Sequence, residues 1–175
     1  LAQLTYRHLT PAEIPDSLLA KFTRHQEPDL VLAFVDGELV EKEDHFIDSW
    51  DASKLVNTSR YLRECAERGG IVVGAFQNDA CVGFVSIESK RFGSHQQYVE
   101  LTYCHVTREL RGQGIGKRLF IQGAKIAKAR RIEKLYLSTH PAVETQAFYR
   151  SMGCVLAEEI NEEILAKETL DIQLD

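Results

Sequence analysis

The chain has 175 residues, of which 44% are hydrophobic and 27% are charged, and its formal net charge is −5 at pH 7. This composition is ordinary for a soluble globular protein, and the length suits one domain, residues 1–175, with a self-sufficient core. The apolar runs are only a few residues long, so no membrane-spanning helix is expected. No basic start precedes an apolar stretch, so we also expect no signal peptide.

The four cysteines, Cys65, Cys81, Cys104 and Cys154, are scattered along the chain without metal-ligand spacing. Three of them stand among apolar residues, which is typical of buried, reduced thiols. Reduced thiols favour a cytoplasmic location, and no metal site is expected.

The N-terminal half alternates short strand and helix patterns. We expect a strand over 4–9, then a helix that Thr10-Pro11 begins and that reaches about residue 24. Strands over 30–35 and 38–43 flank Asp36-Gly37, a strong hairpin signal. A helix over about 53–68 follows, and Gly69-Gly70 ends it.

The C-terminal half is expected to continue with strands over 71–76 and 81–88, a loop over 89–97 and a strand over 98–106. A helix over about 115–130, a strand over 135–139 and a helix over 143–152 come next. Strands over 154–157 and 169–174 close the chain, joined by the acidic segment 158–168. The order predicts an α/β fold with a mixed, mostly antiparallel central sheet and helices on both faces.

The segment 111–116, Arg-Gly-Gln-Gly-Ile-Gly, lies where the strand over 98–106 gives way to a basic helix. Glycines at a helix start leave backbone N–H groups uncovered, and the helix dipole adds positive potential there, so the segment favours an anion such as phosphate. A dinucleotide fingerprint fails because Lys117 stands at its third glycine. A Walker loop fails because Arg111 and Arg118 stand where it needs Gly and Ser or Thr. A tight helix-start turn without a ligand is the alternative.

The charge of the neighbouring residues supports an anion site. Residues 108–134 hold nine Lys or Arg against two Glu and so carry +7, which leaves −12 for the rest of this −5 chain. A cationic patch on an acidic protein indicates a local polyanionic ligand, although much of the basic helix reads as a solvated face. Nucleic acid is not expected as the partner, because the patch is small and lacks interleaved aromatic residues.

The pattern R-x-x-G-x-G after a strand resembles the coenzyme A pyrophosphate loop of the GNAT N-acetyltransferase superfamily. The resemblance covers residues 71–157 well and the first 70 residues loosely. It implies the GNAT fold, acetyl-CoA as co-substrate and no metal. It also implies that the backbone of the preceding strand holds the pantetheine arm. The cofactor-binding residues that it implies are Cys104, His105, Val106, Arg111, Gly112, Gln113, Gly114, Ile115, Gly116 and Lys117.

A second resemblance concerns the segment 147–153, Ala-Phe-Tyr-Arg-Ser-Met-Gly, which is similar to the tyrosine motif of the same family. It implies that Tyr149 protonates the departing thiolate, as a phenol within hydrogen-bond reach can. A packing role for Tyr149 is the alternative. The chain departs from the family pattern at Ala142, where many members carry asparagine, and at Cys154, which replaces an aromatic residue.

Glu100 is the expected general base. It is the only acid in the strand 98–106, and partial desolvation there favours its neutral form and makes it a stronger base. This strand resembles the one that carries the catalytic glutamate in histone acetyltransferases. A solvent-facing edge position is the alternative for Glu100, and His105 and His140 are alternative bases.

The expected function is transfer of acetyl from acetyl-CoA to a primary amine of a small molecule by direct attack in a ternary complex. Protein or peptide acetylation and a non-catalytic acyl-CoA-binding domain of the same fold are the alternatives. Neither a membrane nor a nucleic acid is expected as a partner. Exposed strand edges at the C-terminus suggest a homodimer.

Overall fold

The computed structural model describes residues 3–175. The chain forms two compact units, one made of residues up to 25 and 49–135 and the other of residues 26–48 and 136–175. The chain passes from one unit to the other three times: in two short strands, β2 (His25–Gln26) and β5 (Asp48–Ser49), and between residues 135 and 136.

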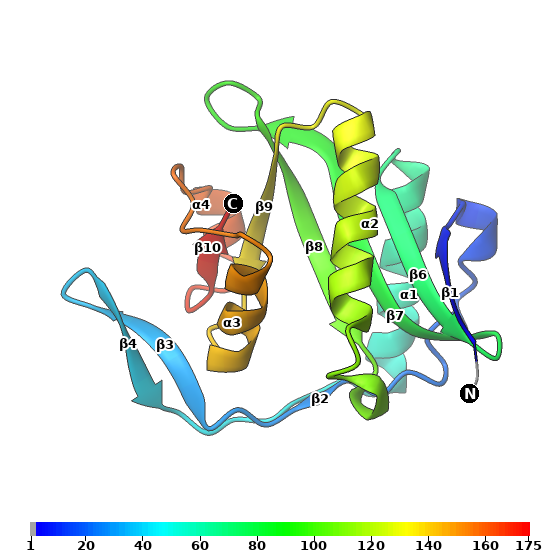
Figure 1. The fold of residues 1–175 in the computed structure, drawn as a ribbon, viewed down its shortest axis with the longest axis horizontal. Helices are drawn as coiled ribbons and strands as arrows, with labels where there is room; N and C mark the ends of the chain where they lie inside the picture. The colour runs from blue at the N-terminus through cyan, green and yellow to red at the C-terminus, as the bar shows by residue number, and fades with distance from the viewer. Residues whose placement is uncertain (1–2) are drawn as a thin grey trace. The chain divides into compact units, whose positions relative to one another are not determined.

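The first unit is built on an antiparallel sheet whose strands lie in the order β1 (Leu4–His8), β6 (Ile71–Gln77), β7 (Ala80–Phe92) and β8 (Tyr98–Val106). Figure 1 shows the helices α1 (Ala52–Glu67) and α2 (Ile115–Ala129) on opposite faces of this sheet. Strands β6 and β7 read as nearly continuous apolar runs because helices cover both of their faces.

Each helix buries a different set of sheet residues. On the α1 side, Leu62 of α1 shares a buried cluster with Val72 and Phe84 of the sheet. On the α2 side, Gly123 lies so close to the sheet that an added Cβ would sit 3.1 Å from Ile87 Cδ1. The missing side chain therefore lets α2 approach the sheet closely.

Local signals set both ends of α1, and its C-terminal end is the one that the sequence predicts. The Asp51 carboxylate accepts a hydrogen bond of 2.7 Å from the Lys54 N–H and caps the first turn. Gly69 ends the helix at a φ of +86°, a conformation that only glycine adopts readily. The turn between β6 and β7 places Asn78 and Asp79 at positive φ, so it is a left-handed hairpin turn.

The second unit contains the predicted hairpin, β3 (Leu30–Val35) and β4 (Glu38–Glu43), whose bounds are confirmed. It also contains most of β9 (Lys134–Thr139), α3 (Val143–Ser151), the short helix α4 (Glu162–Leu165) and β10 (Ile172–Leu174). Strand β10 pairs antiparallel with β9. The hairpin is tied to the start of α3, because the Leu32 N–H donates to the Pro141 carbonyl at 2.7 Å.

The predicted helix reaching residue 24 is wrong. Only a 3₁₀ turn, η1 (Pro11–Glu13), forms there, followed by turns. Pro15 explains the difference, since it lacks an N–H and disfavours helical geometry at Ile14, whose ψ is +77°. The apolar side chains Leu19 and Phe22 of this segment are nevertheless in the core.

Three further predicted boundaries are wrong. Strand β7 continues to Phe92, because Arg91 and Phe92 pair with β8, so the loop is shorter than 89–97. Residues 154–157 form only an isolated bridge, Leu156 with Leu174, and the last strand begins at Ile172.

Hydrogen bonds from Val155 and Ala157 cover the outer edge of β10. The edge that suggested a homodimer is therefore not exposed along these residues.

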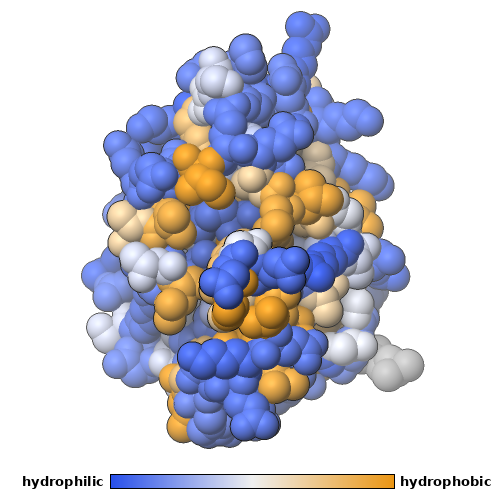
Figure 2. Space-filling view, turned by 90° about the vertical axis from the view of Figure 1, so that its left-hand side faces the viewer, coloured by the Kyte–Doolittle hydropathy of each residue, from blue (hydrophilic) through white to orange (hydrophobic). Residues whose placement is uncertain are grey.

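Several large apolar side chains of the second unit are exposed, among them Phe34, Val155 and Leu170. Figure 2 shows apolar surface (orange) interrupted by polar surface (blue) on the face that it presents. Among residues 3–175, no helix is long and apolar enough to cross a membrane.

Candidate functional site

The glycine segment forms the turn between β8 and α2, as predicted. A 3₁₀ turn, η2 (Arg108–Leu110), precedes it, and Gly114 is the N-cap of α2. Gly112 and Gly114 have φ of +76° and +78°, in the left-handed region. An added Cβ at either position would meet no protein atom within 4 Å, so both glycines border open space.

The start of α2 presents backbone N–H groups to that space. The first hydrogen bond of the helix runs from the Arg118 N–H to the Gly114 carbonyl at 3.1 Å, so the N–H groups of residues 114–117 have no acceptor within the helix. Gln113 and Lys117 are exposed, and Ile115 is buried and anchors the first turn to the core. These features fit a bound pyrophosphate.

Arg111 has a structural contact that the sequence did not predict. Its Nε donates to the Val106 carbonyl at 3.2 Å, and its Nη1 donates to the His25 carbonyl at 2.9 Å. The guanidinium therefore fastens the glycine segment to the end of β8. A guanidinium suits this task because its donors form a rigid fork.

Strand β8 carries the other predicted residues of this unit, and its register is irregular. Ser86 pairs with Tyr103 and Ile87 pairs with Leu101, so Thr102 is an extra residue on β8, a β-bulge. Directly paired residues point to the same face of a sheet. Leu101 therefore shares the α2 face with Ile87, and Tyr103 shares the α1 face with Ser86.

The bulge places Glu100 on the α1 face. Neighbouring residues of an extended strand point to opposite faces, so Glu100 lies opposite Leu101 and on the face of Tyr103. Burial, and secondarily the Glu100 charge, raise the pKa of Tyr103. Glu100 is half-buried, which agrees with the partial desolvation expected of it.

His105 is enclosed by aromatic rings on the same α1 face. Its ring centroid lies 5.3 Å from that of Trp50, 5.8 Å from Phe84 and 5.6 Å from Tyr103. Burial, together with the charges of Arg24 and Arg111, holds the pKa of His105 well below its ordinary value. The imidazole is therefore neutral and a weak proton acceptor, which favours Glu100 over His105 as the base.

Cys104 lies on the other face of the strand. It pairs with Val85, and its thiol contacts the Gly116 carbonyl at 3.8 Å. The structure thus brings Cys104, Val106, Arg111 and Gly116 together at one end of β8 and the start of α2.

In the second unit, Tyr149 lies on α3 and is only 8% exposed. Its ring contacts Phe148 edge to face at a centroid distance of 5.0 Å. The Tyr149 carbonyl accepts hydrogen bonds from the N–H groups of Met152 and Cys154 at the end of the helix.

His140 has the turn role that a histidine before proline favours. Its Nδ1 accepts a hydrogen bond of 3.1 Å from the Ala142 N–H, and its ring stacks on Phe46 at 4.6 Å. Gln146, which the sequence did not single out, donates to the Thr139 hydroxyl and the His140 carbonyl at 2.8 Å each. These bonds fix residues 139 and 140, which precede α3, against the helix itself.

The four cysteines are free thiols, and three of them are buried. Burial raises the pKa of Cys65 and of Cys81 to about 12, and that of Cys154 to about 11. Within residues 3–175, no group of His, Cys, Asp or Glu side chains is arranged to hold a metal ion.

Comparison with solved structures supports the fold. A nourseothricin acetyltransferase is 16% identical, with a TM-score of 0.65 and coverage of 98% of this chain and 95% of its own. A Bacillus anthracis protein assigned as a streptothricin acetyltransferase and solved with acetyl coenzyme A is 18% identical, with a TM-score of 0.70 and the same coverage. A ribosomal-protein-alanine N-acetyltransferase from Brucella melitensis is 16% identical, with a TM-score of 0.58 and coverage of 91% and 96%.

These likenesses confirm the expected α/β fold class, with a mixed, mostly antiparallel sheet and helices on both faces. No curated protein sequence matches the chain. The sequence model of the acetyltransferase (GNAT) family matches residues 39–154, a range that contains β8, the glycine segment and Tyr149. The chain therefore belongs to the acetyltransferase (GNAT) family and is an acyltransferase.

Proposed function

We propose that the protein transfers acetyl from acetyl-CoA to a primary amine of a small molecule. The observation that carries this proposal is the glycine-lined helix start after β8, with backbone donors facing open space. It fits the pyrophosphate of coenzyme A, and the Bacillus anthracis structure contains acetyl coenzyme A. We further propose that residues 1–175 act as one cytoplasmic domain.

Two observations support an amine as acceptor. The Glu100 carboxylate lies near the aromatic ring of Tyr103, which contacts the ring of Tyr61 at a centroid distance of 5.4 Å. Acidic and aromatic groups together suit a cation. Two of the similar structures are named for nourseothricin and streptothricin, which are small molecules.

The proposed reaction is direct attack in a ternary complex. Glu100 takes a proton from the ammonium form of the acceptor, directly or through water, and the amine nitrogen attacks the thioester carbonyl carbon. A backbone N–H of β8 donates to the tetrahedral oxyanion. The carbon–sulfur bond then breaks, and Tyr149 gives its proton to the departing thiolate. The nitrogen of the new amide loses its second proton to water, and the Tyr149 phenolate regains a proton from solvent.

Release of free thiol from acetyl-CoA in the presence of an amine panel tests the function. We expect release with at least one small amine and none without acceptor. Because one similar structure is named for a ribosomal protein, the panel includes peptides with a free N-terminal alanine. Release with peptides alone would contradict the small-molecule assignment.

The variant Glu100→Gln tests the base. It keeps the shape and the hydrogen bonding of the side chain but removes the proton acceptor. Turnover should fall on the order of 10²–10⁴-fold, with little change in acetyl-CoA affinity. Turnover should also partly recover as rising pH deprotonates more amine in solution. Wild-type turnover with an unchanged pH profile would remove Glu100 from the mechanism.

A further inference from the structure

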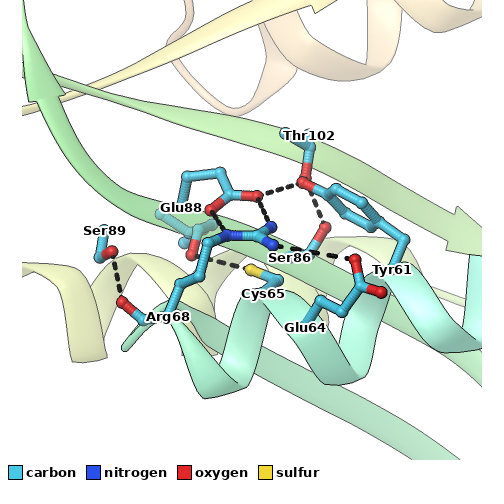
Figure 3. Close-up of polar contacts among 9 residues, drawn as sticks. Tyr61, Glu64, Cys65, Arg68, Ser86, Glu88, Ser89 and Thr102 are labelled. Carbon is cyan, nitrogen blue, oxygen red and sulfur yellow. Dashed lines mark hydrogen bonds and ion pairs between the residues drawn. The ribbon is translucent and has the colours of Figure 1, made fainter.

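A hydrogen-bond chain runs from α1 to the bulge of β8, next to Glu100. Figure 3 shows its side chains converging between α1 and strands β7 and β8. The Thr102 hydroxyl lies 2.7 Å from the Ser86 hydroxyl and 3.0 Å from the Tyr61 phenol oxygen. The Tyr61 phenol also contacts Glu88, to which Arg68, the C-cap residue of α1, donates a hydrogen bond of 2.8 Å.

The direction of each bond in this chain follows from the available protons. A phenol has one proton, and an ionised carboxylate has none, so Tyr61 donates to Glu88. Thr102 must then donate to Tyr61, and Ser86 must donate to Thr102. The chain therefore has one consistent order, from Ser86 through Thr102 and Tyr61 to the Glu88 carboxylate.

The charges keep this order stable. Burial by itself would raise the pKa of Glu88, but the hydrogen bonds from Arg68 and Tyr61 outweigh it and lower that pKa. Burial and the bond to Glu88 both raise the pKa of Tyr61, so the phenol keeps its proton. A partly buried chain of this kind is costly to leave partly satisfied, which makes it a rigid support.

We propose that Tyr61 and Thr102 are positioning residues that hold the bulge of β8 and thereby orient Glu100. Thr102 is the extra residue of that bulge, and it is the only member of the chain on β8. Its hydroxyl ties the bulge to α1 through Tyr61 and to β7 through Ser86. This inference rests on the proposed role of Glu100 as the base.

The matched variants Thr102→Val and Thr102→Ser test the inference. Valine keeps the branched shape and loses the hydroxyl, whereas serine keeps the hydroxyl. Thr102→Val and Tyr61→Phe should each lower kcat about tenfold, since a displacement near 1 Å costs up to about 10²-fold. The KM for acetyl-CoA should stay within about twofold. Thr102→Ser should retain most of the wild-type kcat.

Tyr136→Phe is the control for a lost buried phenol. Tyr136 is fully buried in the second unit, where its oxygen accepts a hydrogen bond of 2.9 Å from the Asn161 N–H. The Tyr136→Phe variant should be less stable than the wild-type protein but keep the wild-type kcat. Amide hydrogen exchange of residues 98–106 should quicken in Thr102→Val and Tyr61→Phe and stay unchanged in Tyr136→Phe.

Combination with Glu100→Gln separates this inference from the proposed base. If Tyr61 and Thr102 act through Glu100, adding Thr102→Val to Glu100→Gln should lower kcat little further. If Glu100→Gln loses turnover while Thr102→Val and Tyr61→Phe keep the wild-type kcat, the positioning inference is wrong and the base stands. Wild-type turnover by Glu100→Gln would overturn both the role of Glu100 as the base and the positioning role of Tyr61 and Thr102.

Discussion

Gly114→Ala distinguishes a ligand-binding glycine from one that only permits a turn. Gly114 has a φ of +78°, and its added Cβ would meet no protein atom within 4 Å. Beyond the strain of a side chain at positive φ, any steric effect of the methyl group must therefore come from a bound molecule. Gly37, in the β3–β4 turn, has a φ of +85° and also has no atom within 4 Å of an added Cβ. Gly37→Ala is thus a matched control for backbone strain.

The expected losses of stability and of coenzyme A affinity come from two contributions, backbone strain and a broken hydrogen bond to phosphate. A left-handed conformation costs a non-glycine residue roughly 1–2 kcal/mol. In a chain of 175 residues this lowers the melting temperature by roughly 2–8 °C, and both variants should show it. If the methyl group also breaks one hydrogen bond to a charged phosphate, about 1.5–3 kcal/mol is lost, or roughly ten- to a hundredfold in affinity.

Calorimetric titration with coenzyme A, beside thermal unfolding, measures both quantities. We expect weaker coenzyme A binding in Gly114→Ala only, with similar melting temperatures in the two variants. Unchanged affinity in Gly114→Ala, or an equal loss in Gly37→Ala, would refute the assignment of the pyrophosphate to this helix start.

Two further predictions concern the second unit. Tyr149→Phe should lower turnover and leave coenzyme A binding nearly intact, because the phenol acts only as the thiolate departs; full turnover would make Tyr149 a packing residue. Burial raises the pKa of Asp171 from 3.8 to about 6, so the folded state binds this proton more tightly than the unfolded state does. Stability due to Asp171 is therefore lost as pH rises from about 4 past 6. Asp171→Asn should raise the melting temperature at pH 8 and change it little at pH 4. The gain in free energy of unfolding at pH 8 should be less than the roughly 3 kcal/mol of a full two-unit pKa shift, because solvent screens the partly exposed carboxyl. An equal gain at both pH values would show that the charge is not the cause.

The sequence predicted the elements whose signals are local. The β3–β4 hairpin was placed correctly because Asp36-Gly37 can adopt the two positive φ values that its turn requires. Strand β8 and the start of α2 were also placed correctly, since aromatic and β-branched residues precede a glycine turn there. The helix expected over 11–24 does not form, because Pro15 interrupts helical geometry despite the helical spacing of the apolar residues.

The hydrogen-bond chain could not be predicted from the sequence, because its members are far apart in it. Tyr61 and Thr102 are separated by 41 residues, and Tyr61 and Glu88 by 27. Tyr61 and Glu88 belong to no motif, and each member of the chain reads alone as an ordinary polar residue of a helix or strand. Only the packing of α1 against the sheet brings them together.

The bulge at Thr102 has the largest consequence for the site. Regular alternation along β8 would put Glu100 on the same face as Cys104, which contacts the start of α2 through the Gly116 carbonyl. The extra residue moves Glu100 to the α1 face instead, while Cys104 stays on the α2 face with Val85. The glycine segment and the carboxylate are therefore presented on opposite faces of one strand. In the proposed ternary complex, an acyl donor held at the start of α2 and an amine held near Glu100 would therefore approach β8 from opposite sides.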